Sequence, residues 1–239
     1  MDEKKIVYKR VLLKLSGEAL SGDAGTGLDF KVMAGVCGAV AQCAKQGVEV
    51  GIVVGGGNFW RGVKNGEGRM DRRRADYMGM LATVMNCLAL QDVLQQQGVE
   101  AKVLTAMEIQ NIGEPFSVET ADEYLRNGKV VVFGGGVGSP FFTTDTGAVL
   151  RAALIGADAV LLAKNVDGVY SADPKKDPGA VRFDSLTYEE VLEKRLAVMD
   201  STATCLAMDN RIPIRVFALC QPENILRAAR GEAVGTLVH

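Results

Sequence analysis

Residues 51–61 read GIVVGGGNFWR, an apolar run that breaks into three consecutive glycines and is followed by an arginine. A near-continuous apolar run is typical of a parallel strand that is buried on both faces. Glycines after such a strand let the backbone approach a ligand, and their N–H groups can converge on an anion. Arg61 would add a planar fork of donors that matches phosphate. The stretch predicts a phosphate site at a strand end, although a tight turn with a surface arginine would explain it when taken alone.

Two further stretches repeat this pattern. Residues 130–140 read VVVFGGGVGSP, and residues 11–17 read VLLKLSG, in which Lys14 stands at the strand end. Open α/β folds bind their ligands at the carboxyl edge of the sheet. Three strands that end in glycine turns therefore predict one crevice. Its two backbone cradles, with Lys14 and Arg61, indicate more than one phosphate group.

Strand patterns alternate with helical patterns along the chain. This order predicts a three-layer α/β/α sandwich with a largely parallel central sheet. No low-complexity linker and no repeat of 20 to 50 residues interrupts it, so we expect a single domain over residues 1–239. We expect strands at 9–15, 48–54, 99–104, 130–133, 159–163 and 214–219, and helices at 30–46, 76–97, 118–127, 148–155, 187–194, 200–210 and 223–230.

Three connecting segments have their own signals. Residues 16–28 predict a polar loop that ends at Asp29, the expected N-cap of the first helix. Residues 61–74 are rich in glycine and charge and predict a mobile surface loop; the cluster at 69–74 is as compatible with a solvated loop as with a phosphate site. Asp167-Gly168 predicts a hairpin turn.

The composition is that of an ordinary globular chain, with 48% hydrophobic residues and a net charge of −2. Such a charge gives no general attraction to nucleic acid, so no stable nucleic-acid partner is expected. The N-terminal residues 1–5 are charged with mixed sign, and no apolar run approaches the roughly 18 residues of a membrane span. The five cysteines form no C-x-x-C pair and are expected to be small buried hydrophobes in a reducing compartment. We therefore expect a soluble, cytoplasmic protein.

Histidine is nearly absent, since the only one, His239, is the last residue. A Ser/His/Asp or Cys/His catalytic arrangement and a histidine metal site are therefore disfavoured. The chain also lacks a Walker A loop and the spacing G-x-G-x-x-G, which disfavours P-loop NTPases and NAD-dependent dehydrogenases. A phosphoryl transferase of another architecture remains. If its acceptor is a phosphate, whose second pKa is about 6, no general base is needed.

Four side chains are candidates for this chemistry. Lys14 is suited to neutralise the transferred group, and Asp145 could hold a magnesium ion or cap the helix that follows it. Tyr170 could stack on a purine or pack on its neighbours. Asp173 could accept from ribose hydroxyls or shape the turn before Pro174.

Five segments carry a resemblance to a known family. The chain resembles the bacterial uridylate kinases, members of the amino acid kinase fold family, in order from about residue 8 to residue 238. The lysine and glycine turns would fit any member of that superfamily, whereas DYMGMLAT and PFFTTD narrow the resemblance to the uridylate enzymes. The segments are KLSGEAL (14–20), GGGN (55–58) with Arg61, DYMGMLAT (76–83), PFFTTD (140–145), and DGVY (167–170) with Asp173-Pro174.

The resemblance implies reversible transfer of the γ-phosphoryl group of Mg-ATP to UMP, giving UDP and ADP for pyrimidine nucleotide (CTP) synthesis. It implies an acceptor half at about 9–160 and an ATP half at about 160–239. By matching position, it assigns Lys14, Arg61, Asp145 and Asp200 to catalysis, with Asp145 as a possible Mg²⁺ ligand. It assigns ATP to Lys14, Leu15, Ser16, Gly17, Gly57, Arg61, Asn165, Tyr170 and Asp173, and UMP to Gly56, Asp76, Val137, Gly138, Ser139, Pro140, Phe141, Phe142, Thr143 and Thr144.

The resemblance also implies regulation and assembly. The family is a homohexamer that GTP activates and UTP inhibits, and the segment implicated in GTP activation is similar to Gly22, Asp23, Ala24, Gly25, Thr26 and Gly27. The chain departs from the family at Ser139, where asparagine is commoner, and in the run 72–74. Lys164-Asn165 replaces a Thr-Lys pair of some relatives, which leaves open which of the two contacts ATP.

Two other function classes stay open: a kinase of the same fold that acts on a small carboxylate, and a non-catalytic nucleotide sensor. The helix expected at 76–97 bears on assembly. Its apolar residues exceed one helical stripe, which predicts a subunit contact unless neighbouring helices of the same chain cover both sides. The stripe consists of Met78, Leu81, Ala82, Met85, Leu88 and Ala89, and the further apolar residues are Met80, Val84 and Leu90.

Overall fold

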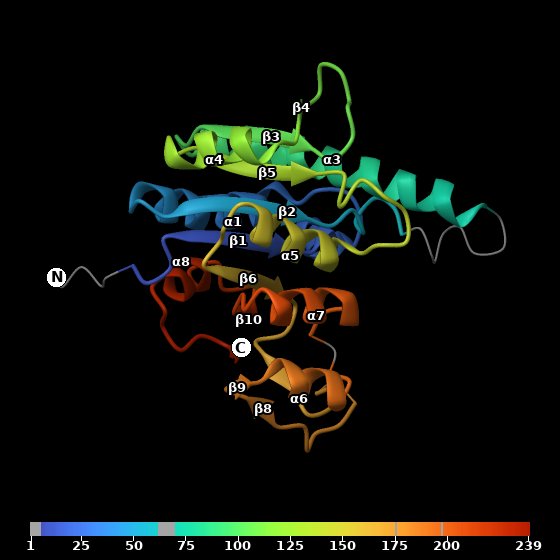
Figure 1. The fold of residues 1–239 in the computed structure, drawn as a ribbon, viewed down its shortest axis with the longest axis vertical. Coiled ribbons are helices and arrows are strands. Elements are labelled where there is room, and N and C mark those ends of the chain that lie inside the picture. Colours follow the sequence, from blue (N-terminus) through green and yellow to red (C-terminus); the bar gives the residue numbers. More distant parts are fainter. Residues whose placement is uncertain (1–5, 62–69, 175, 197) are drawn as a thin grey trace.

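The computed structural model describes residues 6–61, 70–174, 176–196 and 198–239, which form a nine-stranded sheet between two layers of helices (Figure 1). Neighbouring strands run parallel except β10 and β11, which are antiparallel. The predicted α/β sandwich with a largely parallel sheet is confirmed. The strands follow one another across the sheet as β4 (Glu114–Pro115), β3 (Ala101–Thr105), β5 (Val130–Gly134), β2 (Glu49–Val54), β1 (Arg10–Leu15), β6 (Ala159–Lys164), β10 (Ile214–Ala218), β11 (Thr236–Val238) and β9 (Ser185–Leu186).

Two hydrophobic clusters lie on the two faces of the sheet. In β1, Leu13 and Leu15 belong to the cluster under α1, whereas Leu12 belongs to the cluster under α5. Strands buried on both faces explain why the sequence shows continuous apolar runs rather than alternation. One face is covered by α1 (Phe30–Lys45), α3 (Arg72–Gln96) and α8 (Asn224–Ala229), and the other by α4 (Val118–Arg126), α5 (Thr144–Leu154), α6 (Tyr188–Glu193) and α7 (Ser201–Asp209).

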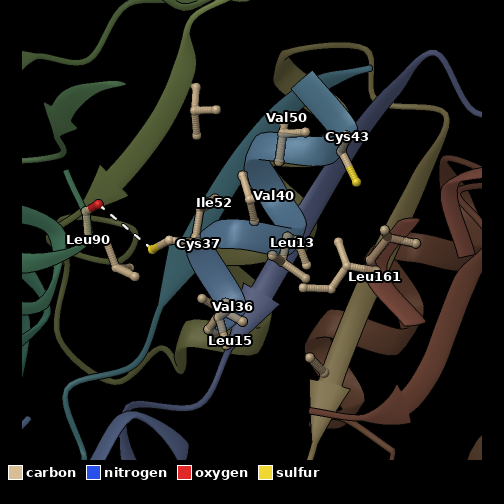
Figure 2. Packing of buried hydrophobic residues seen from close by; sticks show 14 of the residues in the cluster. Leu13, Leu15, Val36, Cys37, Val40, Cys43, Val50, Ile52, Leu90 and Leu161 are labelled. Carbon is tan, nitrogen blue, oxygen red and sulfur yellow. Dashed lines mark hydrogen bonds between the residues drawn. The ribbon is translucent and has the colours of Figure 1, made fainter. Parts of the chain in front are cut away.

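Figure 2 shows the first cluster, in which Val36 and Val40 of α1 lie over Leu13 and Ile52 of the sheet. Cys37 lies in the same layer, with its Sγ 4.0 Å from the Leu90 carbonyl oxygen of α3. The layer therefore joins α1 and α3 to the central strands whose carboxyl ends form the site.

The cysteines follow the expectation only in part. Cys37, Cys43 and Cys87 are buried, and burial raises the pKa of the Cys37 and Cys43 thiols to about 12. Cys205 and Cys220 are exposed, contrary to the prediction, because they fall on the outer side of α7 and beyond the end of β10. All five are free thiols.

Two predicted loops are partly helical. Residues Gly17–Ala24 form a 3₁₀ helix, η1, within the segment expected to be a loop. The helix α3 begins at Arg72 rather than Asp76, because the Asp71 carboxylate accepts from Arg73 N and Arg74 N as an N-cap. Arg72, Arg73 and Arg74 of the predicted mobile loop therefore form the first turn of α3. Residues 62–69 of that loop lie outside the described residues.

The short strands were not predicted. Each of these strands has only two or three residues, too few for a periodic pattern. They are β4, β9, β11, β7 (Val169–Tyr170) and β8 (Arg182–Phe183). β7 and β8 form an antiparallel pair of their own. Asp167-Gly168 lies between β6 and β7, which belong to different sheets, so the predicted hairpin turn at this position is wrong.

The helix α3 is longer than the helix predicted at 76–97, and it is strongly apolar. Its best 18-residue window has a mean hydropathy of 1.2, so length and composition alone would let it cross a membrane. Half of that window is buried against the rest of the chain, and a single helix that passes this test is weak evidence for a membrane span. The other half includes an exposed apolar face.

Candidate active site

The strands β5, β2, β1 and β6 are adjacent and parallel, so their carboxyl ends meet at one edge of the sheet. At this edge Gly55 N donates to the Leu15 carbonyl oxygen at 3.0 Å. A Cβ on Gly17 would lie 2.4 Å from the Gly55 oxygen, so a side chain there would collide with backbone. A glycine is therefore required at position 17, just after β1, for the loops that follow β1 and β2 to touch.

Gly56 is in contact with the helix that covers this edge. A Cβ there would lie 2.7 Å from the Gly79 oxygen and 2.8 Å from the Ala82 Cβ of α3. No larger residue fits without moving the helix. The glycine run thus lets α3 pack directly onto the loop.

A buried amide pair ties the glycine loop to its surroundings. Asn58 and Asn86, of α3, bond to each other at 2.8 and 2.9 Å through their amide groups. Asn86 Nδ2 also donates to the Gly55 oxygen, and Asn58 Nδ2 to the Gly27 oxygen, each at 2.7 Å. The pair therefore joins α3, the glycine loop and the segment before α1.

The charged centre lies where β1 meets the start of α5. Lys14 Nζ is 2.6 Å from Asp145 Oδ1, and both side chains are largely buried. Thr143, rather than Asp145, caps α5, since its Oγ1 accepts from Asp145 N and Thr146 N. The interpretation of Asp145 as an N-cap is therefore wrong, and its carboxylate faces Lys14.

Asp200 supports this charged centre through hydrogen bonds to residues at the start of α5. It caps α7 by accepting from Ala203 N at 2.9 Å, and it accepts from the hydroxyls of Thr143 and Thr146 in α5. Its oxygens are thus engaged within the protein. Asp200 fixes the N-terminus of α5 against α7 and so fixes the helix that carries Asp145.

Lys164, at the end of β6, lies between the charged centre and a cavity of about 410 Å³ that Tyr170 and Asp173 also line. Its Nζ donates to the Val198 carbonyl oxygen. Burial lowers the pKa of Lys164, as does the charge of Lys14, while Asp145 raises it. Lys164 thus has electrostatic contact with both members of the charged pair.

Two other residues predicted to contact ATP, Asn165 and Tyr170, are placed differently from Lys164. Asn165 is exposed and is not among the described residues that line the cavity. Tyr170 Oη donates to Asp167 Oδ1 at 2.7 Å, a bond that raises the pKa of Tyr170. The tyrosine ring is therefore fixed at the cavity rather than free to rotate away.

Arg61 lies beside the glycine loop. Its Nε is 3.4 Å from the Gly57 carbonyl oxygen, and its guanidinium forms an ion pair with Glu18 of η1. A phosphate ligand that binds Arg61 must share the guanidinium with Glu18.

A smaller pocket of about 140 Å³ lies between α3 and the loop from β5 to α5. Seven of the ten residues predicted for UMP line it, and the other three, Gly138, Pro140 and Phe141, belong to the same loop. Phe141 N donates to Asp76 Oδ2 at 2.9 Å. The lining residues of the predicted set are Gly56, Asp76, Val137, Ser139, Phe142, Thr143 and Thr144.

The segment predicted to respond to GTP is divided between two places. Gly22 and Asp23 line a cavity of about 380 Å³ beside the start of α1. Thr26 Oγ1 and Gly27 N both donate to the backbone carbonyl oxygen of Asn58, at 3.0 and 3.1 Å. The segment thus contacts both a surface cavity and the glycine loop.

The charged centre also bears on the predicted metal. Among the described residues, no group of three or more His, Cys, Asp or Glu side chains is arranged to hold an ion. Mg²⁺ in phosphate-transfer sites is commonly held by one or two carboxylates together with phosphate oxygens and water. Asp145 Oδ1 accepts no hydrogen bond of good geometry, although Lys14 lies close to it. This carboxylate oxygen therefore fits a Mg²⁺ ion that arrives bound to a nucleotide.

Sequence reasoning assigned no role to Glu18 or Asn86, and it treated Arg72 only as part of the cluster at 69–74; all three have partners at this edge. The partners of Glu18 and Asn86 lie on other elements, so no local motif marks them, whereas Arg72 and Asp76 have the i,i+4 spacing of a helical ion pair. For Asn86, the usable signal was a polar residue within the apolar pattern of a long helix.

Comparisons with known proteins agree with this architecture. The model of the amino acid kinase family matches residues 9–218. The structure of UMP kinase from Bacillus anthracis is 40% identical with a TM-score of 0.93, covering 97% of this chain and 96% of that one. UMP kinase from Ureaplasma parvum is 35% identical with a TM-score of 0.90, covering 96% and 98%. Uridylate kinase from Archaeoglobus fulgidus is 32% identical with a TM-score of 0.75, covering 96% and 99%.

Proposed function

Because the chain belongs to the amino acid kinase family, we propose that it is a UMP kinase, which reversibly transfers the γ-phosphoryl group of ATP to UMP and yields UDP and ADP. The relatives named for this activity match it over nearly their whole length. The observation that carries the proposal is the Lys14–Asp145 pair, in which Asp145 directly follows Thr144 of the pocket that Asp76 lines and interacts electrostatically with Lys164 of the cavity that Tyr170 lines. A transfer site needs two ligands to meet at one charged centre.

We assign the two cavities to the two nucleotides. ATP occupies the cavity of Lys164, Tyr170 and Asp173, and UMP the pocket between α3 and the β5–α5 loop. The position of Lys164 beside Asp145 favours it over Asn165 as the residue that contacts ATP. The acceptor half then corresponds to about 9–160 and the ATP half to about 160–239 of one domain.

The reaction needs positioning and charge neutralisation rather than a proton acceptor. An oxygen of the UMP phosphate, already ionised at neutral pH, attacks the γ-phosphorus of ATP, and the bond from that phosphorus to the β-γ bridging oxygen breaks. Lys14 and Arg61 stabilise the negative charge of the transferred group, and Asp145 holds Lys14 in place. The Mg²⁺ that accompanies ATP supplies further charge neutralisation, and Asp145 is the residue that would hold it.

The remaining properties follow the family resemblance and are part of the proposal. The enzyme acts in the cytoplasm, in pyrimidine nucleotide synthesis, as a homohexamer without a membrane or a stable nucleic-acid partner. GTP and UTP act as effectors. The contact of Thr26 and Gly27 with Asn58 supports a role for the segment 22–27, because it connects that segment to the glycine loop.

One assay of ADP release tests the proposal against its alternatives. We expect UMP to be strongly preferred over CMP and dUMP, since polar groups that bind uracil and a ribose hydroxyl are left unpaired by the wrong ligand. Equal turnover of CMP and UMP would contradict it. Turnover of acetylglutamate without response to UMP would indicate a carboxylate kinase, and nucleotide binding without any turnover would indicate a sensor.

A further inference from the structure

Arg72, in the first turn of α3, is bonded to the acidic residue of the acceptor pocket. Its Nε lies 3.1 Å from Asp76 Oδ1 and 2.9 Å from Asp76 Oδ2. The Asp76 side chain is 15% exposed and the Arg72 side chain 50% exposed. An ordinary surface pair one helical turn apart would leave both groups in water, whereas here the carboxylate is on the pocket side.

Phe141 completes the arrangement from the opposite wall. Its backbone N–H donates to Asp76 Oδ2 at 2.9 Å, and its ring centroid is 5.6 Å from the Arg72 guanidinium carbon. Its φ of +73° is in the left-handed region, which aromatic residues rarely adopt. The N-terminal turns of α3 project beyond the sheet (Figure 1), and these contacts join them to the β5–α5 loop. Three residues thus connect the two walls of the pocket.

The chemistry of the pocket indicates what Asp76 binds. Asp76 is the only ionisable side chain among the described residues that line it. A carboxylate repels a phosphate, so the phosphate belongs near Gly56 and the N-terminus of α5 instead. Asp76 must then accept from uncharged donors, such as ribose hydroxyls. A carboxylate can accept about four hydrogen bonds, so its bonds to Arg72 and Phe141 leave capacity for a ligand.

We propose that Arg72 is a positioning residue that fixes the Asp76 carboxylate and the Phe141 backbone, and through them gives the acceptor pocket its preference for ribonucleotides over deoxyribonucleotides. This inference rests on the proposed function. Arg72 does not need to touch the substrate. Its planar guanidinium bonds the carboxylate and stacks on the ring at once, which the point charge of a lysine cannot reproduce.

The variant Arg72→Met tests this role. We expect KM for UMP to rise by about tenfold, as for the loss of one hydrogen bond to a charged group, with KM for ATP and kcat within about twofold. The ratio of kcat/KM for UMP to that for dUMP should fall by about tenfold, because Asp76 is no longer held toward the 2′-hydroxyl. Arg72→Lys should recover only part of both effects.

Arg73→Met is the matched control. Arg73 lies on the same turn, but it bonds to Asp71 at 3.1 Å and is not among the described residues that line the pocket, and 67% of its side chain is exposed. It should leave KM and the UMP to dUMP ratio unchanged. Thermal unfolding of each variant shows whether the fold persists.

Three results would overturn the inference. They are an Arg72→Met enzyme with unchanged KM for UMP and unchanged selectivity, a uniform loss in which KM for ATP, kcat and the unfolding temperature all change, and equal effects of Arg72→Met and Arg73→Met. A wild-type enzyme that does not phosphorylate UMP would reject the proposed function and this inference together. An active wild-type enzyme with an indistinguishable Arg72→Met variant would reject the inference alone.

Discussion

At the scale of single residues, the centre of the molecule is the pairing of Lys14 with Asp145 at 2.6 Å. Both side chains are largely buried, and the Asp145 backbone N–H is taken by the cap of α5. In this setting the carboxylate orients the ammonium group before substrate arrives. Preorganised charges of this kind stabilise a transition state because they need not reorient during the reaction.

We predict that Lys14→Ala and Asp145→Asn each lower kcat by at least about a hundredfold, since one preorganised charge contact to the transition state contributes roughly 3 kcal/mol. ADP release at saturating ATP and UMP measures the effect, with circular dichroism to verify folding. Lys129→Ala is the control, because Lys129 forms a more exposed ion pair with Glu100 (2.8 Å) just before β5, at the opposite end of that strand from the site. A variant with near-normal kcat and an unchanged spectrum would show that its residue was misassigned.

Residue identities were predictable where a local pattern carries them. Lys14, Gly17 and Gly56 stand at the ends of apolar strands, so their place at the sheet edge follows from the sequence. The partners of Arg72 and Asn86 could not be predicted in this way. Arg72 lies over the Phe141 ring and Asn86 donates to the Gly55 oxygen, and no spacing in the chain encodes these contacts between segments that are far apart in sequence.

At the scale of elements, the predicted bounds of the long parallel strands agree with the structure to within about one residue for most of the strand ends. They were predictable because burial on both faces gives each strand a continuous apolar run. The two- and three-residue strands were missed. They are stabilised by pairing with neighbours, as β9 is with β11, rather than by any preference of their own. The start of α3 was placed at Asp76 because the arginines before it suggested a solvated loop, while Asp71 caps the helix earlier.

The close contact of Gly56 with α3 leads to a prediction about these two elements. In Gly56→Ala, the added methyl group meets the Gly79 oxygen, so we expect the loop and helix to separate. The free energy of unfolding should fall by about 1–3 kcal/mol, and KM for UMP should rise. Urea unfolding and initial rates measure the two quantities.

Gly38→Ala in α1 is the control for this change. A Cβ there meets no atom within 4 Å, so the variant should gain up to about 1 kcal/mol from helix propensity and keep its KM. Equal stability losses in both variants would show that the contact of Gly56 with α3 has no special role.

At the scale of the whole molecule, α3 shows an apolar face that the chain itself leaves uncovered. The large residues of the predicted stripe, Met78, Leu81, Met85 and Leu88, are exposed, whereas Met80, Val84 and Leu90, which lie off that stripe, are buried. The sequence thus indicated an excess of apolar surface but not its direction, since both sides of the helix are apolar. The exposed large hydrophobic residues on this face are Tyr77, Met78, Leu81, Met85 and Leu88.

We predict that this face joins two copies of the chain about a two-fold axis, because monomers rarely expose a contiguous apolar stripe of this kind. Light scattering at micromolar concentration should give a multiple of the 25.4 kDa chain mass, and Leu81→Glu should lower it. Val181→Glu, an equally drastic change at an exposed residue outside α3, should not. A wild-type mass near that of one chain would reject the assembly.

The helix α3 has a further consequence because of what lies on its other side. Besides Asp76, it carries Thr83, whose Oγ1 accepts from Gly135 N, and Asn86, which bonds to Gly55. One helix thus contacts the proposed acceptor pocket on one side and the proposed partner on the other. If association changes the affinity for UMP by some factor, UMP must change the association constant by the same factor, as thermodynamic reciprocity requires. Apparent affinity for the acceptor then varies with the concentration of the enzyme itself.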